Sequence, residues 1–151
     1  MFEVEPTMVR IGEGLELSQR GEREAARRFF AEVWVDIGEE SGDPLHRCAL
    51  AHAMADVQDD ASEELVWDLR ALEAADLITE GRAKEAGVQG SVSALYPSLH
   101  LNVGECYRKL GALDLARAHV ERGRAAAAAL GDDGYGEMIR NGLERLAERL
   151  R

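Results

Sequence analysis

The chain has 151 residues, of which 46% are hydrophobic and 31% charged, and its formal net charge is −11 at pH 7. This length suits one domain with its own hydrophobic core, and the composition lies outside the range typical of disordered chains. The acidic balance excludes sequence-independent binding to nucleic acid or to anionic membranes, because both require a concentrated excess of Lys and Arg.

The N-terminal part of the chain predicts a hairpin of two helices over residues 7–37. Apolar side chains recur at steps of three and four residues on both sides of Gly21. Glycine can adopt the left-handed conformation that ends a helix, so Gly21 is the expected turn.

A second hairpin is expected over residues 44–78. Asp43 is a suitable N-cap and Pro44 a suitable first residue for its first helix. Its second helix carries an apolar stripe of leucines at helical spacing, Leu65, Leu69 and Leu72. Gly and polar side chains, including Gly81, Gly87 and Gly90, then dominate residues 79–93, which we expect to form an insertion with frayed or irregular structure.

The clearest hairpin is expected over residues 94–130, with a turn at Gly111. A last amphipathic helix follows over residues 136–150, and its polar outer face suits a helix that covers the edge of a repeat array. The sequence thus predicts a single all-α domain over residues 1–151, with three hairpins and a C-terminal capping helix.

Two of these hairpins share a pattern of small and large residues. In the third hairpin it reads His100-x2-Val103-Gly104-x2-Tyr107, then Gly111, then Ala116-x3-Val120. In the first it reads Gly14-x2-Leu17, then Gly21, then Ala26-x3-Phe30. This pattern resembles the tetratricopeptide repeat (TPR) family, whose repeat reads W-x2-L-G-x2-Y followed by A-x3-F. The match is strongest over residues 98–120, and the middle hairpin is degenerate because Gln58 stands where the turn glycine belongs.

The TPR resemblance implies that the first helix of each hairpin lines a concave groove that binds a peptide or a partner protein. By register, the partner-binding residues are His52, Asp56, Leu101, Asn102, Glu105, Arg108 and Lys109. The same register places Ile11, Leu15 and Ser18 in the groove from the first hairpin, and Cys48 from the second.

These positions also suggest two more specific ligands, a peptide carboxylate and a metal ion. Asn102, Arg108 and Lys109 are similar to side chains that grip a peptide carboxylate in chaperone-binding TPRs, but Ile11, Leu15 and Cys48 replace the other donors that such a clamp needs. Cys48, His52 and Asp56 are spaced four residues apart on one helix face, which would suit metal ligands. We favour a buried thiol and a surface histidine for this face, because a closed zinc site needs four matched ligands.

Motifs that would indicate catalysis are missing from the sequence, which has neither a nucleophile elbow, a P-loop nor HExxH. Trp34 and Trp67 are expected mainly in the core. We therefore expect a cytoplasmic adaptor or scaffold that binds a protein or peptide and is not an enzyme. No cofactor, nucleic acid or membrane partner is expected, and self-association stays open. The alternative is a small-molecule or metal sensor built around His52.

Overall fold

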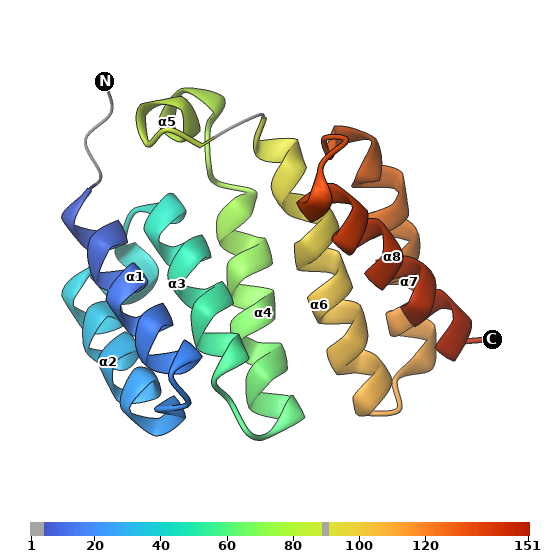
Figure 1. The fold of residues 1–151 in the computed structure, drawn as a ribbon, viewed down its shortest axis with the longest axis horizontal. Coiled ribbons are helices and arrows are strands. Elements are labelled where there is room, and N and C mark those ends of the chain that lie inside the picture. The colour runs from blue at the N-terminus through green and yellow to red at the C-terminus, as the bar shows by residue number, and fades with distance from the viewer. Residues whose placement is uncertain (1–4, 89–90) are drawn as a thin grey trace. The chain divides into compact units, whose positions relative to one another are not determined.

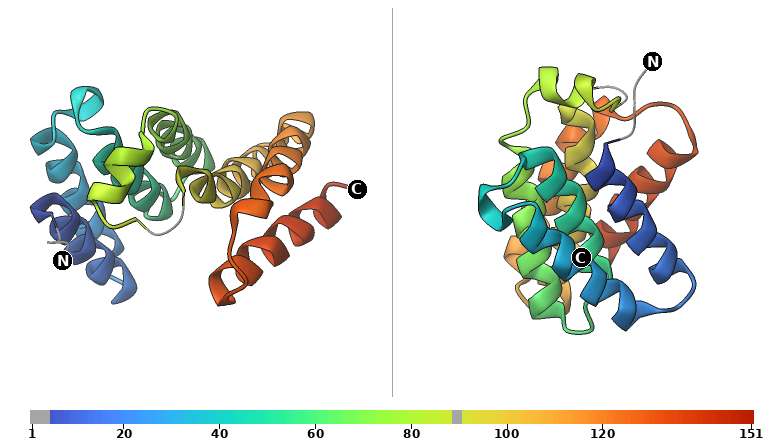
Figure 2. Two further views of the ribbon diagram at one scale, coloured as in Figure 1. Left: turned by 90° about the horizontal axis from the view of Figure 1, so that it is seen from above. Right: turned by 90° about the vertical axis from the view of Figure 1, so that its left-hand side faces the viewer.

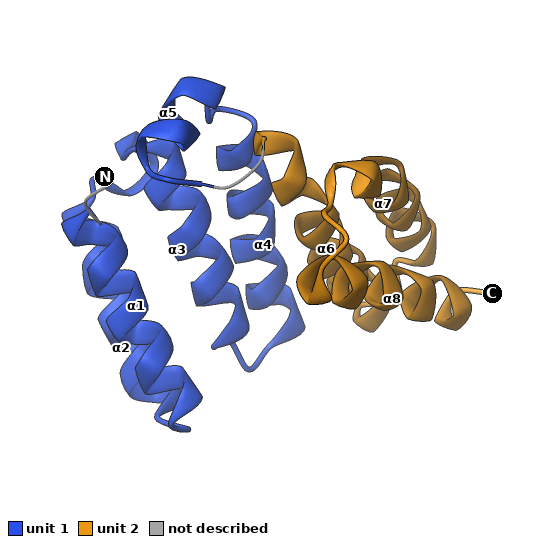
Figure 3. Cartoon of the chain, turned by 45° about the horizontal axis from the view of Figure 1, so that its top comes forward, with its two compact units in different colours: residues 1–88 blue, residues 89–151 orange. Residues whose placement is uncertain are grey.

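The computed structural model describes residues 5–88 and 91–151, and every regular element in these ranges is helical (Figure 1). The all-α class expected from the sequence is confirmed. The chain forms two compact units, residues 1–88 and residues 89–151 (Figure 3). None of the helices in the described ranges combines the length and the apolar character that crossing a membrane requires.

The first unit contains two antiparallel helical hairpins. Helices α1 (Pro6–Gln19) and α2 (Arg23–Asp36) form the first, and α3 (Pro44–Asp56) and α4 (Ala61–Ala75) form the second. A short 3-10 turn, η1 (Glu39–Ser41), joins the hairpins, and α3 packs on both α1 and α2. Figure 2 shows the same arrangement of helices from two other directions.

Local signals in the sequence fix where these helices begin and end. Gly21 has a φ of 83°, so the predicted left-handed turn is confirmed. The Asp43 carboxylate accepts a hydrogen bond of 2.9 Å from the backbone N–H of Leu45, and Pro44 opens α3 as expected. Asp60 caps α4 in the same way.

The core of the first unit is built around Phe30, whose side chain is fully buried. Gly14 of α1 lies against this ring, and a Cβ atom placed on Gly14 would come within 2.2 Å of Phe30 Cε1. The close approach of α1 to α2 therefore depends on the missing side chain. The other buried members of this core are Ile11, Ala26, Val33, Trp34, Leu50, Ala53, Met54 and Val57.

A short helix, α5 (Glu80–Glu85), occupies part of the segment expected to be an insertion. Arg82 ties it to the rest of the first unit by donating to both carboxylate oxygens of Glu5, at 2.7 and 2.8 Å, and to Asp43 at 2.8 Å. These hydrogen bonds hold the pKa of Glu5 down at about 2. His46 also contacts Glu5, at 2.6 Å. The expected glycine position Gly90 lies outside the described residues.

The second unit consists of one hairpin and the last helix. Helices α6 (Tyr96–Lys109) and α7 (Leu113–Ala126) form the hairpin, and α8 (Gly134–Arg149) packs on both. Two short 3-10 segments flank the hairpin, η2 (Val92–Leu95) before α6 and η3 (Ala127–Ala129) after α7. Gly111 has a φ of 81°, which confirms the predicted turn.

Gly104 is a close-packing position of the second unit, and Gly104→Leu is expected to lower the free energy of unfolding of this unit by about 1–3 kcal/mol. A Cβ atom at Gly104 would lie 3.1 Å from Leu146 Cδ2 of α8 and 3.5 Å from the Ala116 carbonyl oxygen of α7. The larger side chain must therefore displace α7 or α8. Urea unfolding followed by tyrosine absorbance measures the effect, because all three tyrosines lie in this unit. An unchanged midpoint would contradict the packing described here.

Candidate functional site

A groove of about 350 Å³ runs between α6 and α8 of the second unit. Leu101, Asn102 and Glu105 line it from α6, and Gly142, Arg145, Leu146 and Arg149 line it from α8. A Cβ atom at Gly142 would lie 2.8 Å from Leu101 Cδ2, so the two helices approach closely at this point. The lining of the groove thus combines two leucines with amide, carboxylate and guanidinium side chains.

Glu105 is held by the cation that follows it by one helical turn. Arg108 donates from Nε to Glu105 Oε2 at 3.0 Å and from Nη2 to Glu105 Oε1 at 2.5 Å. These hydrogen bonds lower the pKa of the Glu105 carboxyl below its ordinary value. Glu105 is therefore ionised at neutral pH, and Arg108 is engaged with it.

The two arginines of α8 that line the groove, Arg145 and Arg149, are less firmly held than Arg108. Arg149 lies 3.7 Å from Glu105 Oε1, a distance longer than a hydrogen bond, while Glu105 is already paired with Arg108. The exposed Arg145 has no ion pair or hydrogen bond within the described ranges. The groove therefore offers two guanidinium groups whose donors remain largely available to a ligand.

The residues that the sequence assigned to partner binding fall into separate places. Leu101, Asn102 and Glu105 line the groove. Arg108 supports Glu105, and Lys109 is exposed at the end of α6. The sequence predicts only a capping role for α8, so the groove residues that this helix contributes were not identified. The small residue Gly142, four residues before Leu146, is the signal that could have shown a second close-packing seam.

His52 and Asp56 lie one turn apart on α3 in the first unit, where His52 is half-buried and Asp56 exposed. Their participation in a common groove with the α6 residues stays a prediction. Leu15 is exposed and Ser18 half-buried. The placement of Ile11 in the groove is wrong: its side chain is 4% exposed and packs in the core of the first unit.

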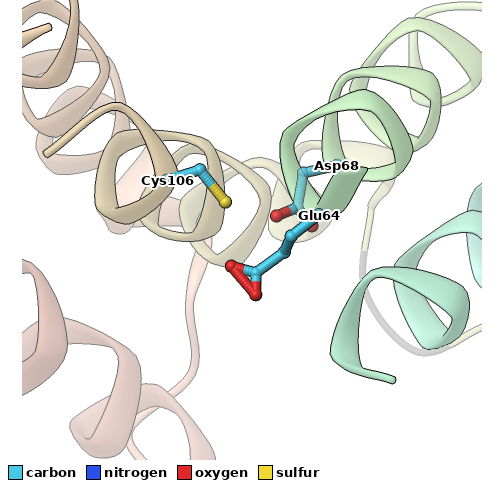
Figure 4. Close-up of side chains that lie close together, drawn as sticks. All are labelled: Glu64, Asp68 and Cys106. Atoms are coloured by element: carbon cyan, nitrogen blue, oxygen red, sulfur yellow. The ribbon is translucent and has the colours of Figure 1, made fainter. Parts of the chain in front are cut away.

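The possible metal ligands of α3 are not brought together. Cys48, His52 and Asp56 form no cluster of ligand atoms within 4.8 Å of one another in the part of the chain that the structure describes. Burial raises the pKa of the Cys48 thiol to about 11, so the thiolate that binds metals is disfavoured. Figure 4 shows three other side chains with metal-binding chemistry: Glu64 and Asp68, one turn apart on α4, and Cys106 on α6.

Two buried histidines pair in the interior of the second unit. His100 Nδ1 and His119 Nδ1 lie 3.0 Å apart, and the rings of Tyr96 and Tyr107 stack on the outer sides of the pair. Burial and the neighbouring His100 lower the pKa of His119 to about 4. His119 is therefore neutral at physiological pH, and its Nδ1 lies at hydrogen-bond distance from His100 Nδ1. The contact between the two rings links α6 to α7.

Comparison of the chain with protein-family models, with curated proteins and with solved structures found no match.

Proposed function

We propose that this protein is a TPR-like interaction scaffold that binds an extended acidic segment of a partner protein in the groove between α6 and α8. The observation that carries the proposal is that the half-buried Leu101, with the 3% exposed Leu146 beneath it, lies beside the available guanidinium groups of Arg145 and Arg149. Such a lining can bury alternate apolar side chains of a peptide while the arginines hold its carboxylates.

The packing of the two hairpins supports the TPR-like assignment. Gly14 and Gly104 hold equivalent positions in the sequence pattern, and each lies where the second helix of its own hairpin approaches, against Phe30 and against Ala116. A helix that follows such a hairpin and packs on its first helix, as α8 does on α6, is what a repeat array requires at its end.

The distribution of charge favours an acidic partner for this groove. Residues 1–88 carry 21 acidic and 9 basic side chains, a net charge of −12, whereas residues 89–151 carry 8 acidic and 9 basic ones, a net charge of +1. The net negative charge of the chain therefore comes from the first unit, and an anionic segment meets little net repulsion from the second. The proposal gives the chain a binding role and no catalytic one.

Arg145→Glu is expected to weaken binding of an acidic peptide at least about tenfold, because it removes a charge-assisted hydrogen bond and adds a repulsive charge. A suitable probe is a fluorescein-labelled peptide of alternating Glu, Leu and Asp with blocked ends, titrated by fluorescence anisotropy. The matching peptide of Gln, Leu and Asn measures the contribution of the carboxylates. A third peptide with a free C-terminus separates side-chain recognition from capture of a terminal carboxylate.

The matched control is Arg122→Glu, which makes the same change of charge on an exposed arginine of α7 away from the groove. Both variants should keep the free energy of unfolding within about 0.5 kcal/mol of the parent. Equal loss of binding in the two variants would show that only net charge matters, and the groove assignment would fail. If the blocked acidic peptide does not bind the parent protein at all, the proposal fails as well.

A further inference from the structure

A separate pocket of about 330 Å³ lies in the first unit, beside the turn between its two hairpins. Its lining combines aromatic, basic, acidic and aliphatic side chains: Trp34, Glu40, Arg47, Arg70, Glu73 and Leu77. They come from α2, η1, α3, α4 and the residues just after α4, so that four helical elements converge on one small space.

The guanidinium group of Arg70 is held in place by two tryptophans. Its Cζ atom lies 4.4 Å from the ring centroid of Trp67 and 5.7 Å from that of Trp34. The two indoles pack edge to face at 5.1 Å, and Trp34 is 8% exposed, which makes this a rigid platform. The tryptophans therefore do more than fill the core.

Stacking leaves the edge of the Arg70 guanidinium free for hydrogen bonds. Its nearest charged partner is Glu40, at 4.0 Å, which is beyond hydrogen-bond distance, and no hydrogen bond to its N–H groups is found in the described ranges. Arg47 uses Nε to donate to the Gly42 carbonyl at 2.9 Å, and its Nη donors have no protein partner there. Two ordered guanidinium groups with available donors thus line the same pocket, as carboxylate recognition requires.

The acidic side chains of the pocket restrict the kind of carboxylate-containing ligand that can bind there. Glu40 and Glu73 are exposed, and the first unit carries a net charge of −12, so a simple anion would meet repulsion. A ligand that carries an ammonium group beside its carboxylate can pair with the two arginines and with the two glutamates at the same time. Trp34 and Leu77 offer an apolar wall for the rest of such a molecule.

We propose that this pocket binds a small zwitterion of amino-acid or dipeptide size, with its carboxylate on Arg47 and Arg70, its ammonium on Glu40 and Glu73, and its side chain against Trp34. The volume of about 330 Å³ is at the lower end of the range for small-molecule pockets, which suits a ligand of this size. The site is independent of the groove between α6 and α8 and stands or falls separately from it.

The test is a thermal-shift screen of the purified 151-residue chain against the standard free L-amino acids and a set of dipeptides at millimolar concentration. A binding zwitterion raises the unfolding temperature by mass action. It also changes tryptophan fluorescence, since Trp34 lines the pocket and Trp67 stacks on Arg70, which lines it too. For each compound that binds, the C-terminal amide and the N-acetyl derivative are expected to lose at least about tenfold in affinity, because each removes one of the two charges.

Arg47→Gln and Glu73→Gln are expected to weaken binding of the same compound by at least about tenfold each. Glu73 is exposed and has no ion pair in the described residues, so Glu73→Gln should leave the stability of the fold unchanged. This variant therefore tests the proposal even if Arg47→Gln does not fold. Arg28→Gln on α2 is the control and should bind normally. Absence of binding by every free amino acid and dipeptide, or binding that survives both pocket variants, overturns the proposal.

Discussion

Replacing Gly14 with alanine is expected to lower the free energy of unfolding of the first unit by about 3 kcal/mol, the upper end of the range for overpacking. The added methyl group would lie 2.2 Å from Phe30 Cε1 and 2.8 Å from two further ring atoms. Phe30 is fully buried among α1, α2 and α3, so the ring has no empty space into which it can move. Either α1 must shift away from α2 or the ring must leave its rotamer.

Gly12 provides a matched control in the same helix. A Cβ atom at Gly12 meets no other atom within 4 Å, so Gly12→Ala should stabilise the unit by about 0.5–1 kcal/mol through the higher helix propensity of alanine. Both variants can be measured by urea unfolding followed by tryptophan fluorescence, because Trp34 and Trp67 report on this unit. A stabilising Gly14→Ala would contradict the packing of α1 on Phe30.

Acidification from pH 6.5 toward pH 4 is expected to cost the second unit about 2–3 kcal/mol through His119. The pKa of His119 is lowered to about 4 in the folded protein, whereas an imidazole in the unfolded chain titrates near 6.5. Between these values the unfolded state binds a proton that the folded state does not. The stabilisation is therefore complete above about pH 6.5 and is lost as the pH falls toward 4.

His119→Gln should flatten this part of the stability profile, since glutamine has no proton to gain. The comparison is made by urea unfolding between pH 7 and 4.5 with tyrosine absorbance as the signal, because Tyr96 and Tyr107 stack on the histidine pair. His52→Gln, in the first unit, is the control and should leave the tyrosine-detected profile unchanged. A parent protein whose second unit is equally stable across this range would contradict the account.

The helices could be predicted from the sequence because their signals are local. Gly21, Asp43 and Gly111 each act within a few residues of their own position, and the apolar periodicity of each helix lies within the helix itself. Helix α5 was not predicted as an element. Its attachment depends on Arg82 reaching Glu5, 77 residues away, and no local pattern contains that contact.

The candidate site was predicted less completely for the same physical reason. The repeat register identified Leu101, Asn102 and Glu105, because positions on one helix face follow from spacing alone. It could not show that α8 supplies Arg145 and Arg149, since pairing between helices is a tertiary property. Ile11 was misplaced because register gives a direction on the helix but does not say whether another helix covers it.

The most direct test of the proposed function is to map the contact surface of the blocked acidic peptide on the ¹⁵N-labelled protein by NMR. We expect the largest changes in amide chemical shift along the groove, at Leu101, Asn102, Glu105, Gly142 and Arg145. Changes concentrated instead around Arg117, Glu121 and Arg124 of α7, or spread evenly over all exposed cations, would contradict the proposed groove.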